Sequence, residues 1–131
     1  MEPLFTKIDC LSLPVDNLDE ALRFYQLTLG HELIWRDDLA AGLRLPNSES
    51  ELVLHLDPRP LEVDLMVESV PEAIDRFCKA GGSKLHGPFP IRIGLCAVVI
   101  DPWGNRLVLL DASKGPLRTD ADGRVEGNTD A

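Results

Sequence analysis

Two carboxylates and a histidine stand on short apolar stretches where they could act on a small molecule. Glu62 and Asp64 are two residues apart in LEVDLMVES, and on an extended strand such residues share one face. Burial of that face would raise the pKa of at least one carboxyl, which is how a general base is tuned. The alternative is that Val63 and Leu65 face the core and both acids face water. His55, in SELVLHLD, could pair with Glu62, so Glu62 and His55 are the predicted catalytic residues.

The first half of the chain predicts the elements that would carry these groups. Residues 7–15, KIDCLSLPV, alternate with the period of a strand. DNLDEALRFYQLTLG has the apolar spacing of an amphipathic helix, with Asp16 or Asn17 as the N-cap and Gly30 at its end. HELIWRD, AAGLRLP and SELVLHLD are separated by turn-forming residues and predict three further strands. The order is therefore β-α-β-β-β.

The second half of the chain repeats this order. LEVDLMVES predicts a strand, VPEAIDRFCKAGG a helix, and SKLHGPFP, GLCAVVIDP and NRLVLLD three more strands. At an offset of 52 residues Val15 matches Val67 and Gly30 matches Gly82, and at an offset of 55 ELVLHLD matches RLVLLD. Such a repeat predicts two modules whose apolar faces are buried in a shared interior. The residues from Ser113 onward have no periodicity and are predicted to be loop or disordered.

Composition bounds the class of protein. The 131 residues, of which 44% are hydrophobic, predict one domain with a real core. The net charge is −9, with 22 acidic and 13 basic residues, which excludes nucleic acid as a main partner. Cys10, Cys78 and Cys96 are odd in number and lack C-x-x-C spacing, which argues against a disulfide framework and a zinc knuckle. No signal-like start or membrane-length apolar run is evident, so we expect a cytoplasmic protein with no membrane partner.

The duplicated β-α-β-β-β pattern, the segment IDCLSLPVDNLDEALRFY and the late DPWGN turn together resemble the vicinal oxygen chelate superfamily. This group contains glyoxalase I, bleomycin-resistance proteins, extradiol dioxygenases, fosfomycin-resistance transferases and methylmalonyl-CoA epimerases. The resemblance covers about residues 5–112 and implies an α+β fold of two tandem βαβββ modules, about 5–57 and 61–112. Their curved mixed sheet would surround a cavity. Residues 113–131 would be a C-terminal tail.

The resemblance also implies where metal ligands would stand, on the first and last strand of each module. The matching positions are Cys10, Val53, Glu62 and Val108, and valine ligates nothing. A divalent metal in a catalytic site needs three or four His or carboxylate ligands. The metal site that could remain is an irregular one of Cys10, Glu62 and His55, with Glu51 or Asp64 as a further ligand. No cofactor is the first expectation, and a divalent metal is the alternative.

Glu51, Asp64 and Trp103 complete the predicted lining of the ligand cavity. Glu51 shares a strand face with Val53 and His55, because strand faces alternate with a period of two. Trp103 stands in the DPWGN turn, where an exposed indole indicates a ligand-stacking rim or a dimer contact.

Two functions follow from the resemblance. The first is a glyoxalase/bleomycin-resistance-like protein that binds a small molecule in the sheet cavity without the family's full metal site, and the acidic balance suits a cationic guest. The alternative is a metal-dependent lyase, isomerase or dioxygenase of glyoxalase type with the irregular site. A third reading is a cavity filled by side chains. A homodimer is expected, because open sheet edges and faces call for a second subunit.

Overall fold

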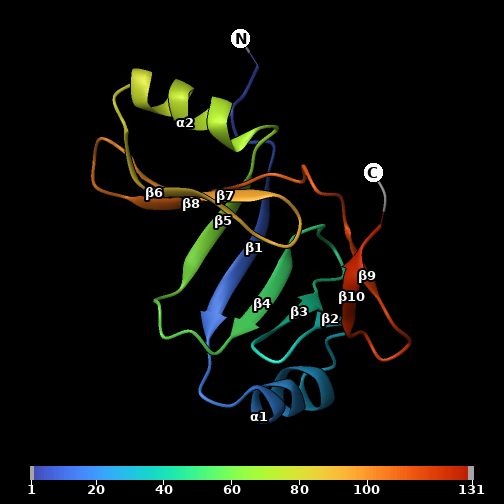
Figure 1. Ribbon diagram of the computed structural model, residues 1–131. Helices are drawn as coiled ribbons and strands as arrows, with labels where there is room; N and C mark the ends of the chain where they lie inside the picture. Colours follow the sequence, from blue (N-terminus) through green and yellow to red (C-terminus); the bar gives the residue numbers. More distant parts are fainter. Residues whose placement is uncertain (1, 130–131) are drawn as a thin grey trace.

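One curved sheet of eight strands organises the protein (Figure 1). The computed structural model describes residues 2–129. The sheet order is β2-β3-β4-β1-β5-β8-β7-β6, so the first half of the chain forms one side of the sheet and the second half forms the other. The strands are β1 (Lys7–Pro14), β2 (Leu33–Arg36), β3 (Ala40–Arg44), β4 (Glu51–His55), β5 (Glu62–Met66), β6 (Ser83–Pro90), β7 (Leu95–Ile100) and β8 (Arg106–Leu110).

The two halves meet at the antiparallel pair of β1 and β5. In this pair Leu11 lies opposite Val63, which is its own counterpart at the repeat offset of 52 residues. Two counterparts can be direct partners only where a two-fold axis passes between them. The sequence repeat is therefore a structural repeat, with an internal axis at the Leu11–Val63 pair.

The outer strands obey the same relation. Ser12 pairs with Val53 in the parallel pair of β1 and β4, and Asp64 pairs with Val108 in the parallel pair of β5 and β8. Each residue of the second pair is the repeat counterpart of a residue in the first. The predicted α+β fold, with two βαβββ units on one curved mixed sheet, is confirmed.

Each half carries one helix on the outer face of the sheet (Figure 1). Asn17 caps α1 (Leu18–Leu22) by accepting from the backbone N–H of Glu20 at 3.0 Å, and the helix continues as a π-helical segment, η1 (Arg23–Thr28). Ser69 caps α2 (Val70–Lys79) in the same way. No helix in the described part of the chain is long and apolar enough to cross a membrane.

The alternation of side chains along β7 and β8 divides the second half into two apolar layers. Ala97, Val99 and Leu109 face outward and pack with Val70 and Ala73 of α2. Between them in sequence, a second set faces the concave side of the sheet and forms its own cluster, which we call the inner cluster: Cys96, Val98, Val108 and Leu110, with Met66, Phe89, Ile91 and Ile93 packed against it. Apolar side chains therefore fill much of the concave face in the second half.

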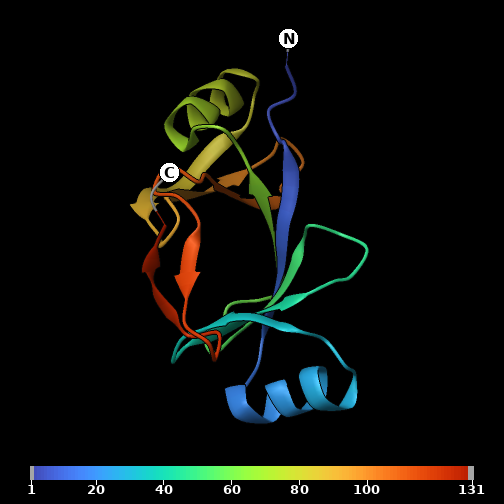
Figure 2. The same ribbon diagram turned by 90° about the vertical axis from the view of Figure 1, so that its right-hand side faces the viewer.

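The prediction that the C-terminal tail lacks regular structure is wrong. Residues after Ser113 form a hairpin of β9 (Leu117–Thr119) and β10 (Val125–Asn128), which lies across from the sheet (Figure 2). Hydrogen bonds anchor it: the Arg36 N–H donates to the Gly123 carbonyl at 2.8 Å, and the Asn128 side chain donates to the Arg92 carbonyl at 2.8 Å. These hydrogen bonds join segments that are distant in sequence, so no local apolar pattern predicts the hairpin.

Candidate functional site

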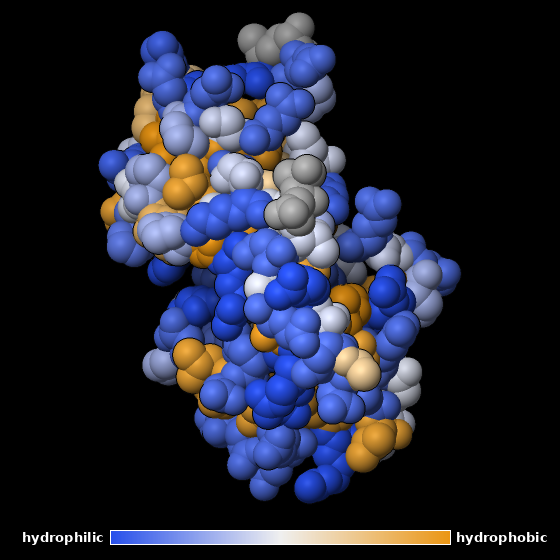
Figure 3. Space-filling view, turned by 45° about the vertical axis from the view of Figure 1, so that its right-hand side comes forward, coloured by the Kyte–Doolittle hydropathy of each residue, from blue (hydrophilic) through white to orange (hydrophobic). Residues whose placement is uncertain are grey.

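A cavity of about 590 Å³ lies between the concave face of the sheet and the tail hairpin. Its floor comes from β1, β4 and β5, one wall from β2 and β3, and the opposite wall from the loop before β7 and the hairpin. Figure 3 shows that hydrophilic residues dominate the outer surface on the side where the hairpin lies. The cavity wall is largely apolar, and its larger apolar members are Ile34, Trp35, Val53, Met66, Ile91, Ile93, Leu110, Pro116 and Leu117.

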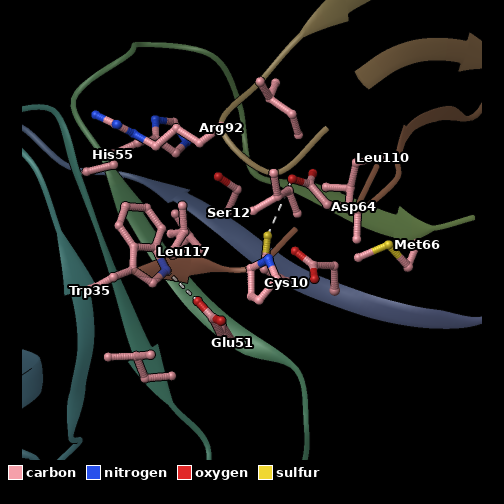
Figure 4. Close-up of a pocket in the computed structure, with 18 of the residues that line it drawn as sticks. Cys10, Ser12, Trp35, Glu51, His55, Asp64, Met66, Arg92, Leu110 and Leu117 are labelled. Atoms are coloured by element: carbon pink, nitrogen blue, oxygen red, sulfur yellow. Dashed lines mark hydrogen bonds between the residues drawn. The ribbon is translucent and has the colours of Figure 1, made fainter. Parts of the chain in front are cut away.

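Three carboxylates gather at one end of this cavity, and we call Asp9, Glu51 and Asp64 the acidic end. Strand register explains the gathering, because Cys10 lies opposite Glu51 on β4 and opposite Asp64 on β5. The Cys10 thiol donates a hydrogen bond to Asp64 Oδ2 over 3.4 Å (Figure 4). Asp64 Oδ1 is shielded from water and has no hydrogen-bond partner among the described residues.

Burial disfavours the charged forms of these groups. It raises the pKa of Asp64 to about 7, with the nearby Glu62 carboxylate adding to the effect. It also raises the pKa of Asp9, which the Lys7 ammonium partly offsets, and the pKa of Glu51, which a hydrogen bond from Trp35 partly offsets. Asp64 is therefore a carboxyl that changes charge near neutral pH inside an apolar cavity.

The indole of Trp35 forms the wall beside Glu51. Its Nε1–H donates to Glu51 Oε1 at 2.6 Å (Figure 4). Trp35 and Gly42 are partners on β2 and β3, and a Cβ at Gly42 would collide with both the indole and the Glu51 carboxylate. The glycine therefore gives Trp35 the room to lie flat across β3 and reach Glu51.

His55 lies at the other end of the cavity from Glu51 on the same strand face. Its side chain is only 3% exposed, and neither ring nitrogen has a hydrogen-bond partner within the described chain. Burial lowers the pKa of His55, the Arg59 cation lowers it further, and the Asp57 backbone and nearby carboxylates offset part of the effect. Although the Asp57 backbone acts on the imidazole, neither nitrogen makes a hydrogen bond of normal geometry within residues 2–129, which is unusual because buried polar groups are normally paired.

Glu62 does not line the cavity. Its Oε1 accepts from Arg59 Nε at 2.8 Å, and Arg59 also pairs with Asp57 at 2.8 Å. Glu62 makes no hydrogen bond with His55, so the structure does not join the predicted catalytic residues into an acid–base pair. Arg59 itself lines the cavity, and its ion pair holds the Glu62 carboxylate.

The remaining predicted positions separate into two groups. Cys10, Val53, Glu51, Asp64 and His55 all line the cavity, as expected from their shared strand faces. Val108 is buried in the inner cluster, where it packs rather than lines the open space.

Trp103 is the predicted cavity residue that the structure places elsewhere. Its side chain is 84% exposed in the turn between β7 and β8, and it is not part of the cavity wall. This turn is at the far end of the hairpin from Leu95 and Leu110, which stand near the cavity. The prediction rested on an exposed indole in a turn, and exposure alone does not tell which end of the hairpin faces the cavity.

The residues do not fit the implied metal site. Within residues 2–129 no group of three or more His, Cys, Asp or Glu side chains could hold one metal ion. Burial and the carboxylates of Asp64 and Asp9 raise the pKa of Cys10, so its thiol keeps the proton that a metal would have to displace. Glu62 is held by Arg59. The predicted set of Cys10, Glu62 and His55 is therefore not assembled as a site.

Several cavity residues have no signal in the sequence. Asp37, Pro116, Leu117 and Thr119 line the wall, but their contacts depend on strand register and on the position of the hairpin. Asp9 reaches the cavity because a bulge between Ile8 and Cys10 interrupts the alternation of β1. A bulge of this kind follows from tertiary packing and not from residue type.

Comparison with known proteins supports the fold. The family model described as a glyoxalase-like domain matches residues 10–110. A hypothetical protein from Bacillus halodurans C-125 superposes with a TM-score of 0.69 at 19% identity, over 86% of this chain and 98% of that chain. Methylmalonyl-CoA epimerase from Mycobacterium tuberculosis gives 0.66 at 20% identity, over 84% and 90%.

A larger enzyme contains the same fold. An extradiol ring-cleaving dioxygenase from B. fuscum gives a TM-score of 0.59 at 23% identity, over 84% of this chain and 33% of that chain. No curated protein matches the chain at a significant level. At these identities the structural neighbours establish the fold alone.

Proposed function

Because the chain belongs to the glyoxalase-like domain family, and with it to the vicinal oxygen chelate superfamily, we propose that it binds a small organic molecule in its cavity. The observation that carries this proposal is His55, a buried imidazole on the cavity wall whose two nitrogens have no hydrogen-bond partner in the part of the chain that the structure describes. A buried polar group of this kind costs free energy unless a bound molecule or water pairs with it. The volume of about 590 Å³ is in the range of small-molecule sites.

The proposed binding does not involve the metal chemistry common in the superfamily. Superfamily members often use a divalent metal. Here the predicted ligands Cys10 and Glu62 are committed to other partners, the thiol to Asp64 and the carboxylate to Arg59. The protein is therefore proposed to bind its ligand without transforming it, and no step of metal-dependent lyase, isomerase or dioxygenase chemistry is assigned to these residues.

Trp35 provides the test, because its indole is part of the cavity wall. The Trp103→Phe variant would leave Trp35 as the sole tryptophan. We expect a saturable change of its fluorescence when 4-phenylbutan-1-ol, 4-phenylbutylamine or 5-phenylvalerate is titrated. The Val53→Phe variant should lose the response, since the larger side chain projects into the cavity, whereas Val63→Phe should keep it. Absence of saturation with all three probes would contradict the proposed function.

We further propose a homodimer located in the cytoplasm. Superfamily members often form dimers, and the exposed side chains of Ile8 and Leu11 leave apolar surface on β1 away from the cavity. Cys10, Cys78 and Cys96 are all free, which suits a reducing compartment. Sedimentation velocity between micromolar and hundred-micromolar protein tests the dimer, and a single monomeric species throughout would contradict it.

A further inference from the structure

We propose that the ligand of the cavity is an elongated organic amine, with an N–H-bearing ammonium group at the acidic end and a neutral hydrogen-bonding group at His55. This inference rests on the proposed function and narrows it to a chemical class. Three features of the cavity carry it: its charge balance, the unpaired atoms at its two ends, and the distance between those ends.

Charge in the cavity is unevenly distributed. Arg59 is paired with Asp57 and Glu62, and Arg92 is paired with Asp37 at 3.1 Å, so these cations are neutralised by carboxylates. The acidic end has three carboxylates, and the exposed Lys7 is the cavity-lining cation near them. An added positive charge would therefore find uncompensated carboxylate at this end.

The atoms at the acidic end favour a cation that donates hydrogen bonds. Asp64 Oδ1 is buried and has no hydrogen-bond partner within residues 2–129, and the Trp35 indole donates to one oxygen of Glu51. A primary ammonium has three N–H donors to offer such oxygens, whereas a quaternary ammonium has none. Hydrogen bonds between charged groups are shorter and stronger than neutral ones, so the preference should be for amines with N–H groups.

His55 is the independent observation at the opposite end. It is 3% exposed, lies on the wall of the same cavity and has both ring nitrogens unpaired among the described residues. Burial and, after it, the Arg59 cation lower the pKa of His55, so the neutral ring would both donate and accept a hydrogen bond. The ligand group that meets it is therefore a hydroxyl, an amide or a similar neutral group.

The register of β4 sets the length of the ligand. Glu51 and His55 are four residues apart on one face, which corresponds to about 13 Å along the strand. Val53 lies between them, and Trp35, Met66 and Leu110 form apolar walls on the same cavity. A ligand that reaches both ends must carry an apolar body between its two polar groups.

Charge selectivity is the first test, measured by Trp35 fluorescence in the Trp103→Phe variant at pH 8. We expect 4-phenylbutylamine to bind at least about tenfold more tightly than the isosteric 4-phenylbutan-1-ol, as one charge-assisted hydrogen bond would give. Both 5-phenylvalerate and the trimethylammonium analogue of the amine should bind more weakly than the amine. Equal or tighter binding of the alcohol or the carboxylate would overturn this inference and leave the proposed function standing.

Substitutions test which carboxylate of the cavity binds the ammonium group. Asp64→Asn should reduce the advantage of the amine over the alcohol from about tenfold to near onefold, because the amide carries no charge. Asp75→Asn makes the same change of net charge on α2, outside the cavity, and should retain the selectivity. If Asp64→Asn does not fold, Glu51→Gln takes its place. An amine advantage that survives both cavity variants would overturn the inference.

A second series tests the far end. The para-hydroxylated amine, 4-(4-hydroxyphenyl)butylamine, should bind several-fold more tightly than 4-phenylbutylamine, which is the expected gain of one neutral hydrogen bond. The gain should vanish in His55→Phe, which keeps the ring and removes its nitrogens. If the hydroxyl gives no gain in the parent protein, the assignment of His55 is wrong.

Discussion

Replacement of Asp111 by alanine should be among the most destabilising single substitutions in this protein. The side chain is 2% exposed. Its Oδ2 accepts from the Val70 N–H at 2.9 Å, and its Oδ1 accepts from the Leu95 N–H at 2.9 Å and from the Ser113 hydroxyl at 2.7 Å and N–H at 3.2 Å. One carboxylate therefore ties together the first turn of α2, the start of β7 and the beginning of the tail.

The size of the loss follows from the donors left behind. Alanine would leave the N–H groups of Val70 and Leu95 without an acceptor, at about 1–3 kcal/mol each, and would release Ser113, so we expect a total of about 4 kcal/mol. Asparagine keeps one oxygen for the donors at Leu95 and Ser113 but turns an N–H toward Val70. We therefore expect Asp111→Asn to cost about 2 kcal/mol, between the parent protein and alanine.

The loss should also depend on pH. Burial raises the pKa of Asp111, but the hydrogen bonds from Val70, Leu95 and Ser113 outweigh it and lower the pKa overall. A carboxyl with a lowered pKa stabilises the fold above its unfolded pKa of about 3.9, and this contribution disappears as pH falls through the lower folded value. The difference between the parent protein and Asp111→Asn should thus be full at pH 7 and shrink below about pH 4.

Urea unfolding followed by circular dichroism measures these free energies. Asp101 is the matched control, because it also accepts hydrogen bonds from a turn, through Trp103 and Asn105, but at the surface. Asp101→Ala should cost much less than Asp111→Ala. A loss below about 1 kcal/mol for Asp111→Ala, or an equal loss at both positions, would refute the argument from burial.

Four further outcomes are expected. Gly42→Ala should push Trp35 off Glu51, shift its emission to longer wavelength and weaken probe binding; unchanged emission would show that the indole does not need the glycine. Burial raises the pKa of Asp64 to about 7, so its neutral form stabilises the fold below about pH 4, and this stabilisation is lost as pH rises toward 7. Asp64→Asn should remove the pH dependence of the unfolding free energy in that range, and an unchanged dependence would contradict the assignment. Elemental mass spectrometry of protein purified without a chelator or histidine tag should find far less than one metal per chain; near-stoichiometric metal that is lost on Glu62→Ala would reverse the binding-protein proposal. Ending the chain after residue 115 should expose the cavity and increase the fluorescence of added anilinonaphthalene sulfonate, whereas an unchanged signal would mean that the hairpin does not cover it.

The fold could be predicted from the sequence because the same local pattern of strands and helix occurs in both halves of the chain. The match of Val15 with Val67, at the same offset as Leu11 and Val63, anticipates the internal axis of the sheet. Alternation likewise predicted that Glu62 and Asp64 share a face. It could not predict that Arg59, three residues before Glu62, would hold that carboxylate while Asp64 enters the cavity.

Other parts of the site depend on tertiary contacts that leave no trace in local pattern. The tail hairpin is anchored by backbone bonds to Arg36 and a side-chain bond to the Arg92 carbonyl, and neither contact requires an apolar period. Trp35 lies in the cavity because a glycine faces it on the next strand, which is visible only once the register is known. The predicted module boundaries, 5–57 and 61–112, remain a prediction.

The inner cluster makes the two halves of the molecule chemically unequal although their strands are related by symmetry. A duplicated sheet offers two equivalent places for a guest, but Val98, Val108 and Leu110 already occupy much of the second. Binding stoichiometry should therefore be one molecule per chain. The positions should also differ in mutational tolerance: substitutions at Val98 or Val108 of the inner cluster should lower the unfolding temperature, whereas those at Ser12 or Val53 should change ligand affinity. A library built to change ligand preference would accordingly draw its positions from the cavity wall on β1, β4 and β5 and leave Val98 and Val108 unchanged.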